Sequence, residues 1–228
     1  MVWALPGPLR DLIRPGAAFR GPAPGLGRAF GRMAALWMPL AFAQAMLGAR
    51  QVLQAYGRLR VEDPPAWLIR AMDVDPGAWR QLAAALPPPP PFGRVWPWLV
   101  VAVPLGVAGT WLHHAVWDHT GLWLLRGARR EGGFRVTLAA EAEALRITSL
   151  GILPALLGWV PVLGWLLALP LMLLEAYLWL YRGFSLAARH GCEPWRGLAA
   201  TVIHAALLGL AALLLALLVL AALPGAGA

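Results

Sequence analysis

The sequence predicts an all-α protein, a polytopic transmembrane helical bundle with five spans. Three observations lead to this prediction. The chain has 228 residues, of which 60% are hydrophobic and only 13% charged, whereas soluble domains are about 45–50% apolar and about 25% charged. Its apolar residues form runs long enough to cross a hydrocarbon core of ~30 Å. Arginine is concentrated between those runs.

The first segments read as a lead-in, a span and a loop. Residues 1–32 carry five arginines broken up by proline and glycine, and we expect this basic lead-in at the cytoplasmic interface. The apolar run at residues 33–56 is the predicted first span, which Pro39 should kink. Residues 57–94 are polar and end near five consecutive prolines, so we expect an extracytoplasmic Pro-rich loop with a polyproline strut.

Four more spans are predicted within residues 95–222. The chargeless run from Ile147 to Leu174 continues into an apolar stretch that is too long for one span. Glycine and proline at residues 158–164 interrupt it, so it should fold as a two-helix hairpin. We place the four spans at about 95–120, 147–160, 162–181 and 198–222.

The distribution of arginine predicts the orientation. The lead-in and the segments 126–146 and 182–197 together hold thirteen arginines, against five in the loop at 57–94. The positive-inside rule then puts the N-terminus in the cytoplasm and the C-terminus outside. The net charge of +8 fits loops held near anionic lipid. No basic helix or aromatic platform predicts nucleic-acid binding, so we expect the lipid bilayer as partner and no nucleic acid.

The choice of basic residue indicates the source. All nineteen basic residues are arginine, and alanine, glycine and proline are abundant. This composition indicates a GC-rich genome, typically bacterial. We therefore expect a multi-pass protein of the bacterial cytoplasmic (inner) membrane.

Three segments carry a resemblance to a known family. They are "GGFRVTLAAEAEALRI" before the third span, the hairpin "ILPALLGWVPVLGWLLALP", and "YRGFSLAARHG" followed by "PWRGLAATVI". Over roughly residues 94–222 the chain resembles the Yip domain of the Ypt/Rab-interacting membrane proteins, in its bacterial branch. The resemblance implies five helical spans and a cytoplasmic N-terminus. Eukaryotic relatives bind Rab-type GTPases through N-terminal regions longer than the 32 residues found here.

The stretch "WLHHAVWDH" at residues 111–119 holds the densest group of candidate ligands. At 100° per residue, only His114 and Asp118 share a helix face. Their i,i+4 spacing is that of two helix-borne metal ligands, but a third ligand must come from elsewhere. We favour an inter-helix hydrogen-bonding cluster, with metal binding and proton transfer as the alternatives.

A wider polar cluster follows from depth in the membrane. His119, Glu175 and His204 each lie seven or eight residues from an arginine that we take to mark the inner interface. An ionisable group at that depth needs a partner. We therefore hypothesise an intramembrane polar cluster, unless Glu175 is protonated or reaches inward to the surface. Its members would be His119, Asp118, Glu175 and His204.

The last span carries small residues at four-residue spacing, which predicts a stripe for close helix packing. A dimer seam there, and hence a homo-oligomer, stays open. Cys192 is the only cysteine, so no intrachain disulfide forms. No phosphate loop or nucleophile elbow is present, and we expect neither catalytic residues nor a cofactor. The predicted stripe consists of Gly197, Thr201, Ala205 and Gly209.

The favoured function is a Yip-like, non-enzymatic interaction or membrane-organising module that binds lipid and another membrane or cytoplasmic protein. One alternative is a transporter or channel-like protein that uses the Glu175/histidine cluster, which requires a cavity reaching Glu175. The other is a membrane-embedded metal-dependent enzyme, which requires three converging ligands.

Overall fold

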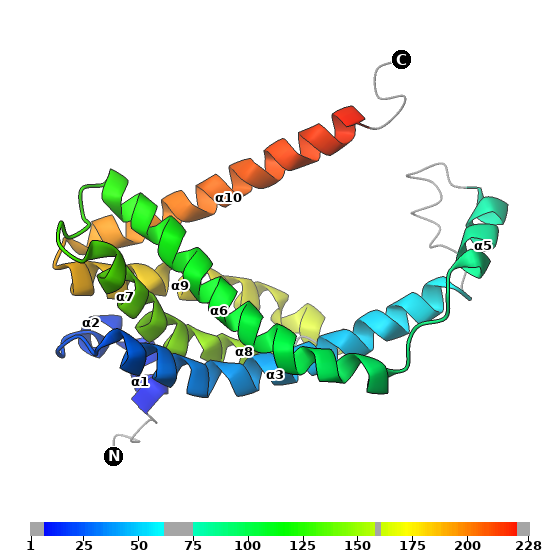
Figure 1. The fold of residues 1–228 in the computed structure, drawn as a ribbon, viewed down its shortest axis with the longest axis horizontal. Coiled ribbons are helices and arrows are strands. Elements are labelled where there is room, and N and C mark those ends of the chain that lie inside the picture. The colour runs from blue at the N-terminus through cyan, green and yellow to red at the C-terminus, as the bar shows by residue number, and fades with distance from the viewer. Residues whose placement is uncertain (1–6, 62–74, 158–160, 223–228) are drawn as a thin grey trace. The chain divides into compact units, whose positions relative to one another are not determined.

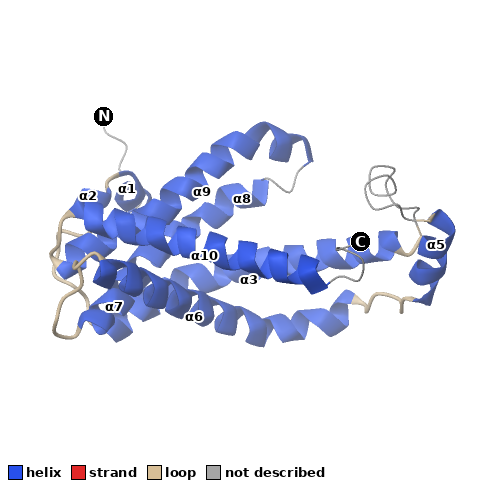
Figure 2. Ribbon diagram, turned by 90° about the horizontal axis from the view of Figure 1, so that it is seen from above, coloured by secondary structure: helices blue, strands red, loops and turns tan. Residues whose placement is uncertain are grey.

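The computed structural model describes residues 7–61, 75–157 and 161–222, and every regular element in these ranges is a helix (Figure 2). The predicted all-α class is confirmed. The chain divides into two compact units, one of residues 1–40 and 107–228 and the other of residues 41–106. Two long helices run through both units, α3 (Leu26–Leu59) and α6 (Phe92–Leu124).

Three of the described helices contain segments long and apolar enough to cross a membrane, at 92–124, 165–190 and 194–219. These segments lie in α6, α9 (Pro161–His190) and α10 (Pro194–Ala222), and they include most of the second, fourth and fifth predicted spans. The fourth span was predicted to end at residue 181. Helix α9 continues to His190 because its later arginines are buried against other helices.

Neither of the other two predicted spans, the first and the third, corresponds to one of the three apolar helices found in the described ranges. Helix α3 contains the predicted first span, but its arginine-free stretch covers only residues 33–49, short of the ~20 residues that a span needs. The predicted span at 147–160 is divided among short elements, and its residues 158–160 lie outside the described residues. These elements are the end of α7 (Gly133–Thr148), the 3-10 turn η1 (Ser149–Gly151) and α8 (Ile152–Leu157).

Helix α7 is a largely buried helix of the first unit. It begins after Gly132, which has a φ of 61° that favours glycine. Four alanines on α7 are buried, which lets α9 pack closely against it. Ser185 of α9 donates to the carbonyl of Ala140 of α7 at 2.8 Å. Helix α9 in turn contacts α10 (Figure 1).

Small residues allow three helices to meet closely. A Cβ added at Gly183 of α9 would lie 2.8 Å from the carbonyl oxygen of Gly197 in α10, and one at Gly121 of α6 would lie 2.8 Å from that of Ala200. Thr201 is also buried in this crossing. The predicted stripe therefore packs at Gly197 and Thr201, whereas its other two residues, Ala205 and Gly209, are exposed.

The basic lead-in is docked on the bundle. Its short helices α1 (Gly7–Ile13) and α2 (Pro15–Ala18) lie against α7 and α9. The hydroxyl of Tyr177 donates to the carbonyl of Leu12 at 2.5 Å, and that of Tyr181 donates to the carbonyl of Asp11 at 2.9 Å. These bonds fix the lead-in to α9.

The second unit contains part of the predicted Pro-rich loop. Helix α5 (Pro76–Ala85) begins at the N-cap Asp75, whose carboxylate accepts from two backbone N–H groups at 3.1 and 2.9 Å. The hydroxyl of Tyr56 donates to the carbonyl of Pro87 at 2.9 Å, so the proline run is tied to the end of α3. Residues 62–74 of the loop lie outside the described residues.

Candidate functional site

A group of ionisable side chains lies inside the first unit, where α6, α7, α9 and α10 meet. We call it the Asp118 cluster. Asp118, Glu141 and His204 have no solvent exposure, and Arg182 is 2% exposed. Charges buried in this way are costly unless they are paired and hydrogen-bonded. The cluster consists of His113, His114, Asp118, Glu141, Arg182 and His204.

Asp118 connects three helices. Its Oδ1 lies 2.7 Å from His204 Nδ1 of α10, and its Oδ2 lies 3.4 Å from Arg182 Nη2 of α9. A carboxylate can only accept, so His204 Nδ1 carries the hydrogen of this bond. One side chain of α6 therefore holds both α9 and α10.

Arg182 has two further neighbours. Its Nη1 contacts His114 Nδ1, and because a guanidinium only donates, that nitrogen accepts and His114 Nε2 carries the ring hydrogen. The guanidinium carbon lies 4.2 Å from the centre of the Trp179 ring, within cation–π range. The Trp179 indole N–H donates to the carbonyl of Thr201 at 2.8 Å, which anchors this ring between α9 and α10.

The remaining ring nitrogens of two histidines face each other. His113 Nε2 lies 3.3 Å from His204 Nε2. Since His204 Nδ1 carries a hydrogen for Asp118, a neutral His204 must accept at Nε2 while His113 donates. The Trp117 ring stacks over His204, with the ring centres 6.2 Å apart. Aromatic rings thus enclose the histidine end of the cluster.

Glu141 differs from the other members. Among the described residues, neither of its carboxyl oxygens has a hydrogen-bond partner. Burial, and then the charge of the nearby Asp118, raise the pKa of Glu141 well above its ordinary value. The charged pair that the geometry shows in the cluster is the ion pair between Asp118 and Arg182.

His119 belongs to a different group of residues. Its Nδ1 lies 2.8 Å from the hydroxyl of Thr137, which lies 3.0 Å from His190 Nε2. The backbone N–H of Arg129 donates to His190 Nδ1 at 3.0 Å, so His190 is a neutral ring that donates to Thr137. The structure therefore brings Asp118 and His204 together but places His119 in this second group, the Thr137 cluster.

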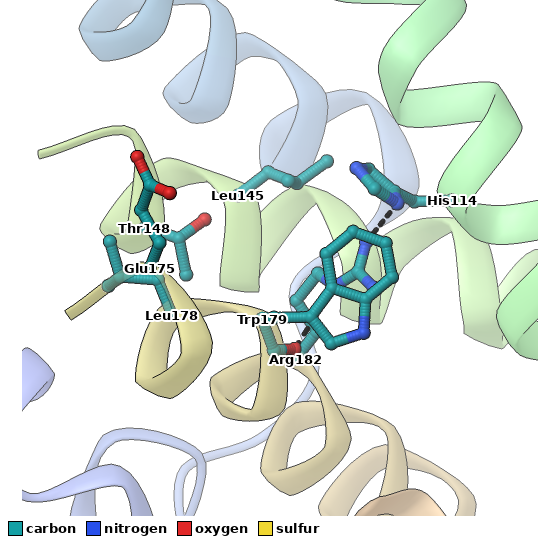
Figure 3. Close-up of a pocket in the computed structure, with 7 residues that line it drawn as sticks. All are labelled: His114, Leu145, Thr148, Glu175, Leu178, Trp179 and Arg182. Carbon is teal, nitrogen blue, oxygen red and sulfur yellow. Dashed lines mark hydrogen bonds between the residues drawn. The ribbon is translucent and has the colours of Figure 1, made fainter. Parts of the chain in front are cut away.

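Glu175 lines a pocket of about 310 Å³ beside the Asp118 cluster. Figure 3 shows the Glu175 carboxylate at one end of the pocket, and His114 with Arg182 at the other. The Glu175 side chain is exposed, and within the described ranges no hydrogen bond joins it to a histidine. It shares a pocket with the cluster but makes no bond to it. The other lining residues are Leu145, Thr148, Leu178 and Trp179.

The predicted metal candidates gain a third residue from another helix. One donor atom each from His114, Asp118 and His204 can be chosen so that all three lie within 4.8 Å of one another. Two imidazoles and a carboxylate are a donor set used by Zn²⁺ and other transition metals. The sequence supplied the i,i+4 pair, and the fold supplies His204.

Three members of the cluster are not predicted by the sequence. Arg182 reads as a marker of the membrane surface, Glu141 lies in a charged segment, and His113 lies on a different helix face from His114. A signal for Arg182 was present, since it lies three residues after Trp179 and seven after Glu175, on one face of a helix. Glu141 and His113 carried no comparable signal.

The Asp118 cluster can hold an ion pair, bind a cation or pass a proton between histidines. The helical fold does not indicate which of these uses applies, because one fold supports many functions. Comparison with known proteins does not indicate it either, since no family model, no curated protein and no solved structure matches the chain.

Proposed function

We propose that this chain is a five-span, Yip-like protein of the bacterial cytoplasmic membrane, with its N-terminus in the cytoplasm and its C-terminus outside. It acts as a non-enzymatic interaction or membrane-organising module. Its working surface is a basic cytoplasmic end formed by the lead-in and the segments 126–146 and 182–197. Anionic lipid and another membrane or cytoplasmic protein are its partners.

The observation that carries this proposal is the meeting of the three basic segments at one end of the first unit. Arg189 Nη1 donates to the carbonyl of Gly21 at 2.6 Å, which joins the third segment to the lead-in. Arg196 Nη1 donates to the carbonyl of Arg126 at 3.0 Å, which joins the third segment to the second. The loops that follow α2, α6 and α9 lie together at this end (Figure 2).

Most arginines of this basic end face solvent. Exposed arginines gathered on one side favour a cytoplasmic location and attract anionic lipid, by about 1 kcal/mol for each residue near the surface. The buried Arg182 and Arg189 are instead used within the bundle. The exposed arginines are Arg10, Arg14, Arg20, Arg28, Arg32, Arg126, Arg129, Arg130 and Arg135.

Bonds inside the bundle hold the basic end in a fixed position, which supports its use as a binding surface. Arg189 binds Glu143 of α7 through two hydrogen bonds, at 2.6 and 2.7 Å, and such bidentate pairs are among the strong ones. Asp118 joins α6, α9 and α10. The basic end is therefore held by bonds from all four helices of the bundle.

The orientation is tested by labelling with a membrane-impermeant maleimide. Cys192 is the only cysteine, so Cys192→Ser gives a cysteine-free background in which Arg130→Cys and Gln81→Cys can be compared. In intact cells, Gln81→Cys should be labelled and Arg130→Cys only after the membrane is opened. Labelling of Arg130→Cys from outside would reverse the proposed topology.

The lipid-binding function is tested by native mass spectrometry of the full-length protein with phosphatidylglycerol or phosphatidylcholine. A triple variant, Arg129→Gln, Arg130→Gln and Arg135→Gln, should weaken phosphatidylglycerol binding roughly 100-fold if each arginine contributes about 1 kcal/mol. The matched control, Arg58→Gln with Arg94→Gln, changes exposed arginines of the second unit and should leave binding unchanged. Equal losses in both variants would refute a specific basic end.

A second candidate function is a transporter or channel-like protein. The observation in its favour is the pocket that Glu175 shares with His114 and Arg182. Reconstituted vesicles with an internal pH-sensitive dye would measure proton movement. Movement that requires the protein and is lost in Glu175→Gln would establish this function in place of the first, and its absence would remove it.

A further inference from the structure

The Asp118 cluster gathers donor atoms at a spacing close to that of a metal site. Donor atoms of His114, Asp118 and His204 lie within 4.8 Å of one another. In a tetrahedral zinc site with bonds of ~2.0–2.1 Å, donor atoms are about 3.3 Å apart. His114 and Asp118 stand one turn apart on α6, which is the spacing at which two side chains of one helix bind the same ion.

A fourth donor is already at the right separation. His113 Nε2 lies 3.3 Å from His204 Nε2, about the distance between two nitrogens bound to one tetrahedral ion. Neutral imidazole is the form in which histidine binds a metal.

Independent evidence for a missing partner comes from the buried polar atoms. Among the described residues, both carboxyl oxygens of Glu141 have no hydrogen-bond partner, and Asp118 Oδ2 and Arg182 Nη2 have only their ion pair with each other at 3.4 Å. Buried polar atoms are nearly always hydrogen-bonded. Glu141 has no solvent exposure, so water at the surface cannot satisfy it.

In this structure the guanidinium of Arg182 is the positive charge beside the donor atoms, since it contacts His114 and pairs with Asp118. Glu141 offers it a second acceptor. We propose that the Asp118 cluster is a binding site for one divalent transition-metal ion, held by His114, Asp118, His204 and His113, and that Arg182 turns to Glu141 when the ion binds.

The donor set decides the class of ion. Imidazole with one carboxylate suits Zn²⁺, Cu²⁺, Fe²⁺ and Ni²⁺, whereas Mg²⁺ and Ca²⁺ prefer oxygen ligands. Zn²⁺ is the natural probe because it has no redox chemistry and accepts four ligands in a tetrahedron. The proposal does not depend on the lipid-binding function, whose test changes exposed arginines that do not belong to the Asp118 cluster.

The test uses full-length protein with a purification tag free of histidine, stripped with a chelator and dialysed against Zn²⁺. The wild type should retain one zinc per chain, and His114→Gln with His204→Gln should weaken binding by ~100-fold or more. The matched control is His119→Gln with His190→Gln, which removes two histidines from the Thr137 cluster and should leave binding unchanged. Absence of stoichiometric zinc in the wild type, or equal losses in the two double variants, would overturn the proposal.

Two further measurements keep the test decisive if the ligand variant fails to fold. Wild-type protein loaded with Co²⁺ should show the visible absorption of a four-coordinate ion, and His113→Gln should shift it. Arg182→Gln should bind Zn²⁺ more tightly, because it removes a competing cation. Weaker zinc binding by folded Arg182→Gln, or a featureless Co²⁺ spectrum, would refute the site.

Discussion

Asp118 and His204 are 86 residues apart in the chain, yet Asp118 Oδ1 lies 2.7 Å from His204 Nδ1 at a site without solvent exposure. This bond and the ion pair to Arg182 give the apolar helices α6, α9 and α10 a polar contact that only one register satisfies. In an apolar bundle, buried polar contacts add to close packing in setting the relative positions of the helices.

The ion pair between Asp118 and Arg182 should therefore be costly to break from one side. Asp118→Asn leaves Arg182 charged without its counter-ion, and we expect a loss of about 3–5 kcal/mol in the free energy of unfolding. Arg182→Gln should cost a similar amount for the converse reason. The double variant should lose less than the sum of the two. Reversible unfolding in mixed micelles measures all three.

An exposed ion pair serves as the control for this cycle. Arg196 and Glu193 are 3.0 Å apart with side chains 31% and 61% exposed, and such pairs contribute about 0–1 kcal/mol. Glu193→Gln, which removes the charge of the more exposed partner, should accordingly have a small effect. Additive losses in the Asp118–Arg182 cycle would contradict a direct interaction between the two residues.

Helix positions were largely predictable, because long apolar runs and their glycine and proline breaks are local signals. The start of α7 at Gly133 follows from the Gly-Gly pair, and α10 follows from an uncharged apolar run. The end of α9 was not predictable from polarity. Arg182 and Arg189 read as surface residues, but each pairs with a carboxylate on another helix, and such a pairing depends on tertiary structure.

The candidate site was predictable only in part. The i,i+4 spacing of His114 and Asp118 is visible in one helix, so half of the donor set could be found. Depth along the helices suggested His204, which the structure joins to Asp118. Glu141 and His119 could not be assigned, because the face of α7 that meets α6 depends on tertiary structure rather than on any periodic pattern of charge.

Glu141 should make the stability of the bundle depend on pH. Its pKa is raised in the folded state by burial and by Asp118. A raised folded pKa means that the stabilisation is complete below the unfolded pKa of about 4.3 and is lost as pH rises through the folded pKa. The melting temperature of wild-type protein in detergent should thus fall with rising pH above this value.

Glu141→Gln keeps the shape of the side chain and removes the ionisation, so it should remove this contribution to the slope of melting temperature against pH. Leu145→Ala is the control, since Leu145 is buried on the same helix. It should lower the melting temperature by a similar amount at every pH through a cavity. An unchanged slope in Glu141→Gln would show that Glu141 is not the group that titrates.

Docking of the lead-in should depend on two tyrosine hydroxyls. Tyr177→Phe and Tyr181→Phe remove the bonds to the carbonyls of Leu12 and Asp11, at a cost of about 1 kcal/mol each. Hydrogen exchange of the lead-in amides should accelerate in both variants, and further in the double variant. Phe134→Leu changes an exposed aromatic residue of α7 and serves as the control. Unchanged exchange in the double variant would mean that these bonds do not hold the lead-in.

The crossing of α9 and α10 should not tolerate a side chain at Gly183. An added Cβ would lie 2.8 Å from backbone atoms of Gly197 and Leu198, which cannot move without separating the helices, and overpacking of this kind costs about 1–3 kcal/mol. Gly209→Ala, in α10 and with nothing within 4 Å of the added carbon, should be neutral or stabilise by up to about 1 kcal/mol. Unfolding in detergent compares the two variants. Equal stability of Gly183→Ala and Gly209→Ala would mean that α9 and α10 do not make this close contact. The alignment of Arg182 and His204, on which the Asp118 cluster depends, would then be wrong as well.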